Sequence, residues 1–141
     1  METRFLRQWK IIVFLLAVML LSACQQAASV EYIQGVWNYE DLHLKPIPGE
    51  SEYIESWVID NGAFAIQGCC FVETNLTGSY RILEADETTV TLELYDMRGN
   101  QGSQPISSGA VSKVTIRINE DGTIDIGRNR GYIRISGPIG K

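Results

Sequence analysis

The chain has 141 residues with 12 basic and 17 acidic side chains, which gives a net charge of −5 at pH 7. Its Lys and Arg residues are scattered among more numerous carboxylates, whereas nucleic-acid binding needs clustered cations that release phosphate counterions. These values exclude nucleic acid as a partner, and the length predicts one folded domain.

The N-terminal 23 residues have the layout of an export signal. Three cations precede an unbroken apolar run over residues 11–21, and small Ser22 and Ala23 follow it. This order of charge, apolar stretch and small residues is typical of a signal peptide. The run is shorter than the roughly 20 apolar residues that a membrane-spanning helix needs. We therefore predict a signal peptide over residues 1–23.

The end of this segment, Leu21-Ser22-Ala23-Cys24, resembles the lipobox of bacterial lipoproteins. The resemblance implies cleavage before Cys24, a diacylglycerol thioether on its sulfur, and an added acyl chain of the palmitate type. Two or more acyl chains make membrane anchoring stable. The expected location is extracytoplasmic, on the cell membrane or on an outer membrane if the cell has one. The alternative is an ordinary secreted protein with an accidental cysteine at the cleavage site.

Cleavage would change the charge and the reach of the chain. Residues 1–23 hold three of the basic and one of the acidic side chains, so 118 residues with a net charge of about −7 remain. Anionic lipid headgroups repel such a domain, and the lipid anchor must hold it alone. We expect a short tether over residues 24–30, in which polar residues 25–29 reach no more than about 20 Å. The folded domain is expected over residues 31–141.

Short alternating runs separated by turn residues predict an all-β domain. The expected strands are residues 33–40, 52–60, 63–72, 78–84, 88–96, 110–119, 123–126 and 131–136. Asn61-Gly62 predicts a tight type I′ hairpin turn, and residues 120–122 predict another turn. Alternation predicts that Val90, Leu92 and Leu94 share one face, as do Val114, Ile116 and Ile118.

Residues 97–109 are polar, rich in Gly and Ser, and contain Pro105, so we expect the longest internal loop there, mobile and at one rim. Eight antiparallel strands close as a small up-and-down barrel or stack as a β-sandwich. The alternation of residues alone leaves both open.

Gly35-Val36-Trp37 in the first strand resembles the G-x-W signature of lipocalin-like (calycin) barrels. That resemblance favours the barrel, and it implies that Trp37 closes one end beneath an Arg of the last strand, where Arg134 stands. A guanidinium over an indole contributes about 0.5–2 kcal/mol and would tie the two strands together. The Thr-Asp-Tyr turn of true lipocalins is absent, so the domain would be a small, divergent member.

The same resemblance implies a binding module for a small apolar or amphipathic ligand. Four aromatic residues are candidates for lining its pocket: Trp57, Phe64, Tyr80 and Tyr95. The alternative is a structural lipoprotein with a solid core, because side chains can fill an eight-stranded barrel. Such a protein would contact another envelope protein through residues 97–109.

Catalytic and metal-binding patterns are weak. His43 is the single histidine, and no nucleophile motif accompanies it, so we expect no enzyme. Glu40, Asp41 and His43 lack a second ligand pair at a recognised spacing, and we expect no metal or other cofactor. Residues 119–125 superficially resemble a calcium loop but lack its closing Glu, which favours a hairpin turn.

Cys69 and Cys70 would be the two thiols left after lipidation. Adjacent Cα atoms lie about 3.8 Å apart, below the usual disulfide range, so a vicinal bridge would be strained. Strand alternation also sends the two side chains to opposite faces. We expect one buried thiol and one outward thiol, with a strained switch or an intermolecular bridge as alternatives.

Overall fold

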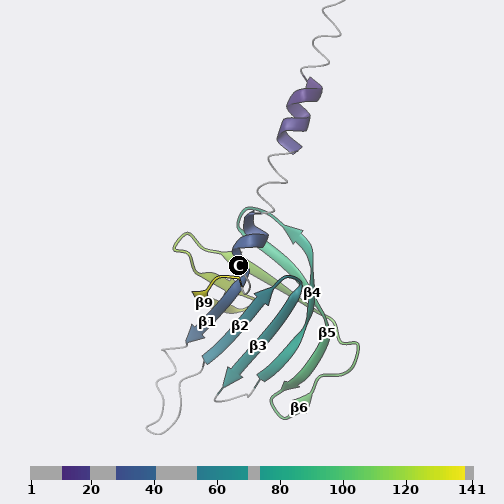
Figure 1. Ribbon diagram of the computed structural model, residues 1–141, viewed down its shortest axis with the longest axis vertical. Coiled ribbons are helices and arrows are strands. Elements are labelled where there is room, and N and C mark those ends of the chain that lie inside the picture. Colours follow the sequence, from purple (N-terminus) through teal and green to yellow (C-terminus); the bar gives the residue numbers. More distant parts are fainter. Residues whose placement is uncertain (1–10, 20–27, 41–53, 70–73, 139–141) are drawn as a thin grey trace, which may run out of the picture.

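The computed structural model describes residues 11–19, 28–40, 54–69 and 74–138. Residues 11–19 form a helix that projects away from a compact β-structure, and a second, short helix covers residues 28–32 (Figure 1). In the described part of the chain, no helix combines the length and apolar character needed to cross a membrane.

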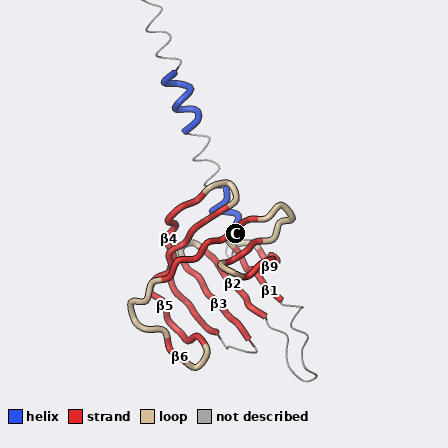
Figure 2. Tube along the Cα trace, turned by 180° about the vertical axis from the view of Figure 1, so that it is seen from behind, coloured by secondary structure: helices blue, strands red, loops and turns tan. Residues whose placement is uncertain are grey.

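Within the described residues, nine antiparallel strands follow the short helix. They are β1 (Gly35–Glu40), β2 (Ile54–Asp60), β3 (Ala63–Cys69), β4 (Thr74–Ala85), β5 (Thr89–Gln101), β6 (Gln104–Pro105), β7 (Ser112–Ile118), β8 (Ile124–Ile126) and β9 (Asn129–Ser136). Their order in the sheet is β4-β3-β2-β1-β9-β8-β7-β5-β6, and β4 also pairs with β5. Eight strands therefore close into a barrel, which Figure 2 shows from behind. The barrel is confirmed, and the sandwich alternative is wrong.

Local sequence explains the hairpins. Asn61 (φ 43°) and Gly62 (φ 85°) form the two-residue turn between β2 and β3, as predicted, because both tolerate positive φ. Residues 119–123 form the β7–β8 hairpin turn, in which the Asp121 carboxylate accepts a hydrogen bond from the Thr123 backbone N–H at 3.0 Å. The calcium-like stretch is thus a turn, as expected.

The barrel interior is filled by one apolar cluster. Val90, Leu92 and Leu94 are buried in it, with Ile116 beside them and Val114 and Ile118 packed against its edge. This confirms the alternation predicted for β5 and β7. Every buried side-chain nitrogen and oxygen in the described residues has a hydrogen-bond partner.

Several boundaries differ from the sequence prediction, and β4, for example, begins at Thr74 rather than at residue 78. Residues 28–32 are helical, and Ser29 is 3% exposed, so this part of the expected tether belongs to the folded barrel. The first strand begins at Gly35 rather than at residue 33. Residues 97–109 are not one loop: β5 continues to Gln101 and turns back into β6. Pairing of β5 with β4 stabilises this extension despite its low intrinsic β-propensity.

Candidate functional site

One end of the barrel is closed by Trp37 and Arg134. The Arg134 guanidinium carbon lies 4.5 Å from the Trp37 ring centre and 4.7 Å from that of Tyr32, and the two rings contact each other with their centres 5.9 Å apart, so the cation lies against a pair of adjoining aromatic rings. Arg134 also donates a hydrogen bond to the Tyr32 carbonyl oxygen. The contact that the resemblance implied is present, and Tyr32 is a third member that sequence reasoning missed.

The turn between the short helix and β1 is fixed by hydrogen bonds. Trp37 Nε1 donates to the Ile33 carbonyl at 2.9 Å. The Gln34 amide nitrogen donates to the Tyr80 hydroxyl at 2.8 Å, and its oxygen accepts from the Asn61 backbone N–H at 2.9 Å. Gln34 therefore joins the helix to the β2–β3 turn and to β4. This end of the barrel is a closed, hydrogen-bonded base.

Three of the four aromatic residues expected to line a pocket lie in the packed core. Trp57, Phe64 and Tyr80 are 6%, 3% and 6% exposed, and the rings of Trp57 and Phe64 stack at 6.3 Å. Tyr95 is half-buried and follows core residue Leu94 in β5, on the other face of the strand. The structure thus places three of the four side chains in the packed core and Tyr95 outside it.

A polar cluster inside the barrel centres on Glu55, which sequence reasoning did not single out. Its Oε1 accepts hydrogen bonds from Trp57 Nε1 and from the Tyr132 hydroxyl, both at 2.6 Å. The Tyr132 hydroxyl in turn accepts from Asn129 Nδ2 at 3.1 Å. The available signal was the alternation of Glu55 with Trp57 and Ile59, which places a carboxylate on an inward-facing position. Here it satisfies two buried aromatic donors.

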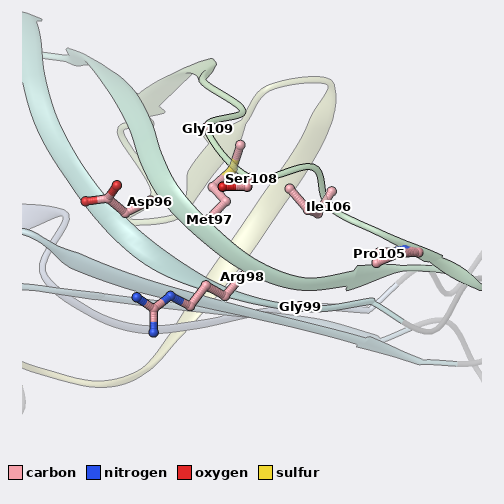
Figure 3. Close-up of a pocket in the computed structure, with 8 residues that line it drawn as sticks. All are labelled: Asp96, Met97, Arg98, Gly99, Pro105, Ile106, Ser108 and Gly109. Atoms are coloured by element: carbon pink, nitrogen blue, oxygen red, sulfur yellow. The ribbon is translucent and has the colours of Figure 1, made fainter.

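A pocket of about 420 Å³ opens in the wall of the barrel, next to the bulged end of β5. It is lined by Asp96, Met97, Arg98, Gly99, Pro105, Ile106, Ser108 and Gly109 (Figure 3). We call it the lateral pocket. Met97 and Ile106 are half-buried and pack against the core, so they form an apolar floor.

Strand pairing explains why the wall opens there. Pairing of β5 with β7 ends at Leu94 and Ser112, and pairing of β5 with β6 begins at Asn100. Between these points the structure assigns β5 no strand partner on that side, and the Ile106 backbone N–H donates to the Gly99 carbonyl at 3.0 Å. Asp96 has a positive φ of 51°, which marks the bulge.

Gly99 is required at this place. Its φ is +119°, and a Cβ there would overlap the Asn75 carbonyl oxygen of β4. Only glycine lets the two backbones approach this closely. The glycines that suggested a loop in the sequence therefore serve a close strand contact, and this is why the pocket was not predicted.

Several predicted site residues lie outside the described residues: Cys24, Asp41, His43 and Cys70. The side chains of Glu40 and Cys69 are not described either. Among the described side chains, no three His, Cys, Asp or Glu residues gather as metal ligands.

Comparisons with known proteins identify no relative. No protein-family model matches the chain, and searches of curated proteins and of solved structures give no match. The proposals below therefore depend on the residues of this chain alone.

Proposed function

We propose that the chain is an extracytoplasmic lipoprotein, anchored through lipid on Cys24, that binds a small apolar or amphipathic ligand in the lateral pocket. The lipobox-like sequence and the preceding apolar run support the anchor. The observation that carries the binding role is a pocket of about 420 Å³ with an apolar floor. Ligand sites commonly have volumes of about 300–1,000 Å³.

Packing favours the lateral pocket over the barrel interior. A ligand among Trp57, Phe64 and Tyr80 would have to displace side chains that already bury more than nine-tenths of their surface. Protein interiors are packed as densely as organic crystals, so such a displacement is costly. The lateral pocket needs no such rearrangement.

The lining chemistry selects an apolar group with a polar end. In Figure 3, Met97 points toward Ser108, while the side chains of Asp96 and Arg98 extend to the other side of β5. The floor is thus apolar, and Ser108 supplies a polar side chain beside Met97. An alkyl chain with a polar head fits this arrangement, and the proposed role involves no catalytic step.

The resemblance to lipocalin-like barrels supports a binding role in general. Gly35, Trp37 and Arg134 carry it, and the closed base around them is the feature that such barrels share with this chain. The lateral position of the pocket is this chain's own feature.

A contact with another envelope protein is the second candidate. It is favoured by the packed core and by the exposure of residues 103–105 around the β5–β6 turn. A protein partner would cover this hairpin and the rim of the lateral pocket together. A small ligand would need only the apolar floor.

Photolabelling with a diazirine-bearing decanoate tests the pocket. The purified full-length lipoprotein should be labelled saturably, and unlabelled decanoate should compete. Ile106→Asn places an amide in the floor and should lower labelling about tenfold, because an alkyl group then meets a polar surface. Val111→Asn is the matched control, since Val111 is 59% exposed and outside the pocket. Equal labelling of both variants would contradict the proposal.

Metabolic labelling with palmitate tests the anchor separately. The wild-type chain should incorporate label and stay with the membrane fraction, whereas Cys24→Ala should lose both the label and the cleavage. Label that persists in Cys24→Ala would show that the lipid is attached elsewhere.

A further inference from the structure

One wall of the barrel carries a patch of uncharged outward side chains. We call it the neutral wall, and it consists of the outward side chains of residues 36–38 in β1, 56–58 in β2 and 133–135 in β9. These strands are neighbours in the sheet, in the order β2-β1-β9. All six outward side chains are uncharged, and four of them are Val or Ile.

The outward positions of the neighbouring strand β3, Ala63, Ala65 and Gln67, are also uncharged, but other strands of the barrel differ. The outward positions of β5, β7 and β8 carry Glu93, Lys113, Arg117 and Asp125. Arg81 of β4 forms an ion pair with Glu93, and Arg130 pairs with Asp125 at 3.1 Å. Charged side chains thus lie on β4, β5, β7 and β8, and next to the neutral wall at Asp60 of β2 and Arg130 of β9.

The neutral wall also exposes large apolar side chains. Ile133 and Ile135 are 62% and 59% exposed. The strand register places the side chains of the wall next to one another. Val36 pairs with Val58 of β2 and with Ser136 of β9, and Asn38 pairs with Ile133. Val36 and Ile135 lie where β1 begins, the end of the barrel reached directly from helix 28–32 (Figure 1).

We propose that the neutral wall rests on the surface of the lipid bilayer. The inference depends on the proposed lipid at Cys24, from which only residues 25–27 lead to helix 28–32. Three residues reach about 10 Å, so the lipid must lie close to the end of the barrel where the apolar part of the wall begins. A tethered acidic domain is repelled by anionic headgroups on every face that carries carboxylates, and the neutral wall carries none and lies close to the tether.

The size of the wall favours a bilayer over a second copy of the chain. A stable protein interface buries about 1,200–2,000 Å² and is centred on Trp, Tyr or Arg residues. The neutral wall has six outward side chains and none of these three types. A tethered domain needs much less contact, because the anchor already supplies the affinity and the wall only has to orient the barrel.

Photocrosslinking tests which surface covers the neutral wall. Benzoylphenylalanine is placed at Asn38 in the wall, or at exposed Thr115, which faces outward on β7. Each full-length lipidated protein is reconstituted in phosphatidylcholine vesicles and irradiated. The bilayer proposal predicts lipid adducts at Asn38 about tenfold above those at Thr115. Ile133→Asn combined with Ile135→Asn should lower the Asn38 adducts about tenfold, since two apolar side chains no longer favour the lipid.

The control and the contrary outcomes are distinct. Val111→Asn removes an equally exposed apolar side chain elsewhere and should leave the lipid adducts unchanged. Equal lipid adducts at Asn38 and Thr115, or protein–protein adducts at Asn38, would overturn the bilayer contact. The mass of the N-terminal fragment is measured in the same samples. An unacylated Cys24 would overturn the proposed anchor as well, whereas an acylated Cys24 with equal adducts would overturn the neutral-wall contact alone.

Discussion

Arg134 on the last strand stacks on Trp37 of the first strand, with the guanidinium carbon 4.5 Å from the ring centre. Tyr32 of the short helix adjoins Trp37, and its ring centre lies 4.7 Å from the same cation. One side chain therefore joins the helix, β1 and β9, which are the elements that must meet for the barrel to close. The stability of the closed barrel should depend on this cation.

Arg134→Ala should destabilise the protein by about 2–4 kcal/mol, because two cation–π contacts and a charged hydrogen bond are lost together. Urea unfolding followed by tryptophan fluorescence measures the change. Arg130→Ala is the matched control on the same strand: its side chain is 78% exposed in an ion pair, and its removal should cost less than about 1 kcal/mol. Equal losses for both variants would contradict the closing role.

Gly35→Ala should cost about 3 kcal/mol or more. Gly35 has a φ of +133°, and a Cβ there would overlap the Ser136 carbonyl oxygen of β9. Gly131 also has a positive φ, of +78°, but a Cβ there would meet no atom within 4 Å. Gly131→Ala should therefore show the backbone cost alone, about 1 kcal/mol. Thermal or urea unfolding compares the two, and a smaller loss at Gly35 would contradict the close approach of β1 and β9.

Tyr132→Phe should cost about 1–3 kcal/mol without changing the fold. The variant removes the hydroxyl that donates to Glu55 and accepts from Asn129, and it leaves the carboxylate with one fewer donor. Tyr95→Phe, which removes a hydroxyl from the other face of β5, is the control and should stay within about 0.5 kcal/mol. If Tyr132→Phe changed the free energy of unfolding as little as Tyr95→Phe, the cluster around Glu55 would not contribute to stability.

Acid should weaken the protein through Asp86 at the β4–β5 turn. Its carboxylate accepts from the backbone N–H of Thr88 at 2.9 Å and of Thr89 at 2.8 Å, and these bonds, that of Thr88 first, hold the pKa of Asp86 below its ordinary 3.8. A lowered pKa in the folded state means that the stabilisation is complete above pH 3.8 and is lost as pH falls through the lower value. Unfolding free energies from pH 6 to pH 2 should therefore fall more steeply for wild type than for Asp86→Asn. Parallel curves would contradict this.

Much of the barrel is predictable from sequence because the signals are local. Asn61-Gly62 fixes a turn by its tolerance of positive φ, and the alternation of Val90, Leu92 and Leu94 fixes a face. Helix 28–32 was missed because five residues show no helical period. Its stability comes from packing of Val30 and Tyr32 on the core, which the local pattern does not reveal.

The lateral pocket was hidden for a related reason. Residues 97–101 are rich in Gly, Asn and Gln, which favour loops, yet Thr74 to Thr77 of β4 pair with them and extend β5. The expected ligand residues were chosen as large aromatics, and large aromatics also fill cores. An aromatic residue that fills the core is distinguished from one that lines a pocket by its burial. Burial depends on contacts between residues that are distant in sequence.

The position of bound decanoate tests the central claim most directly. After saturating photolabelling of the wild-type lipoprotein, peptide mass spectrometry measures how the label divides between the lateral pocket and the barrel interior. The account predicts that competed label is recovered on Met97 or Ile106. Competed label on Trp57, Phe64 or Tyr80 would place the ligand in the barrel interior and contradict it.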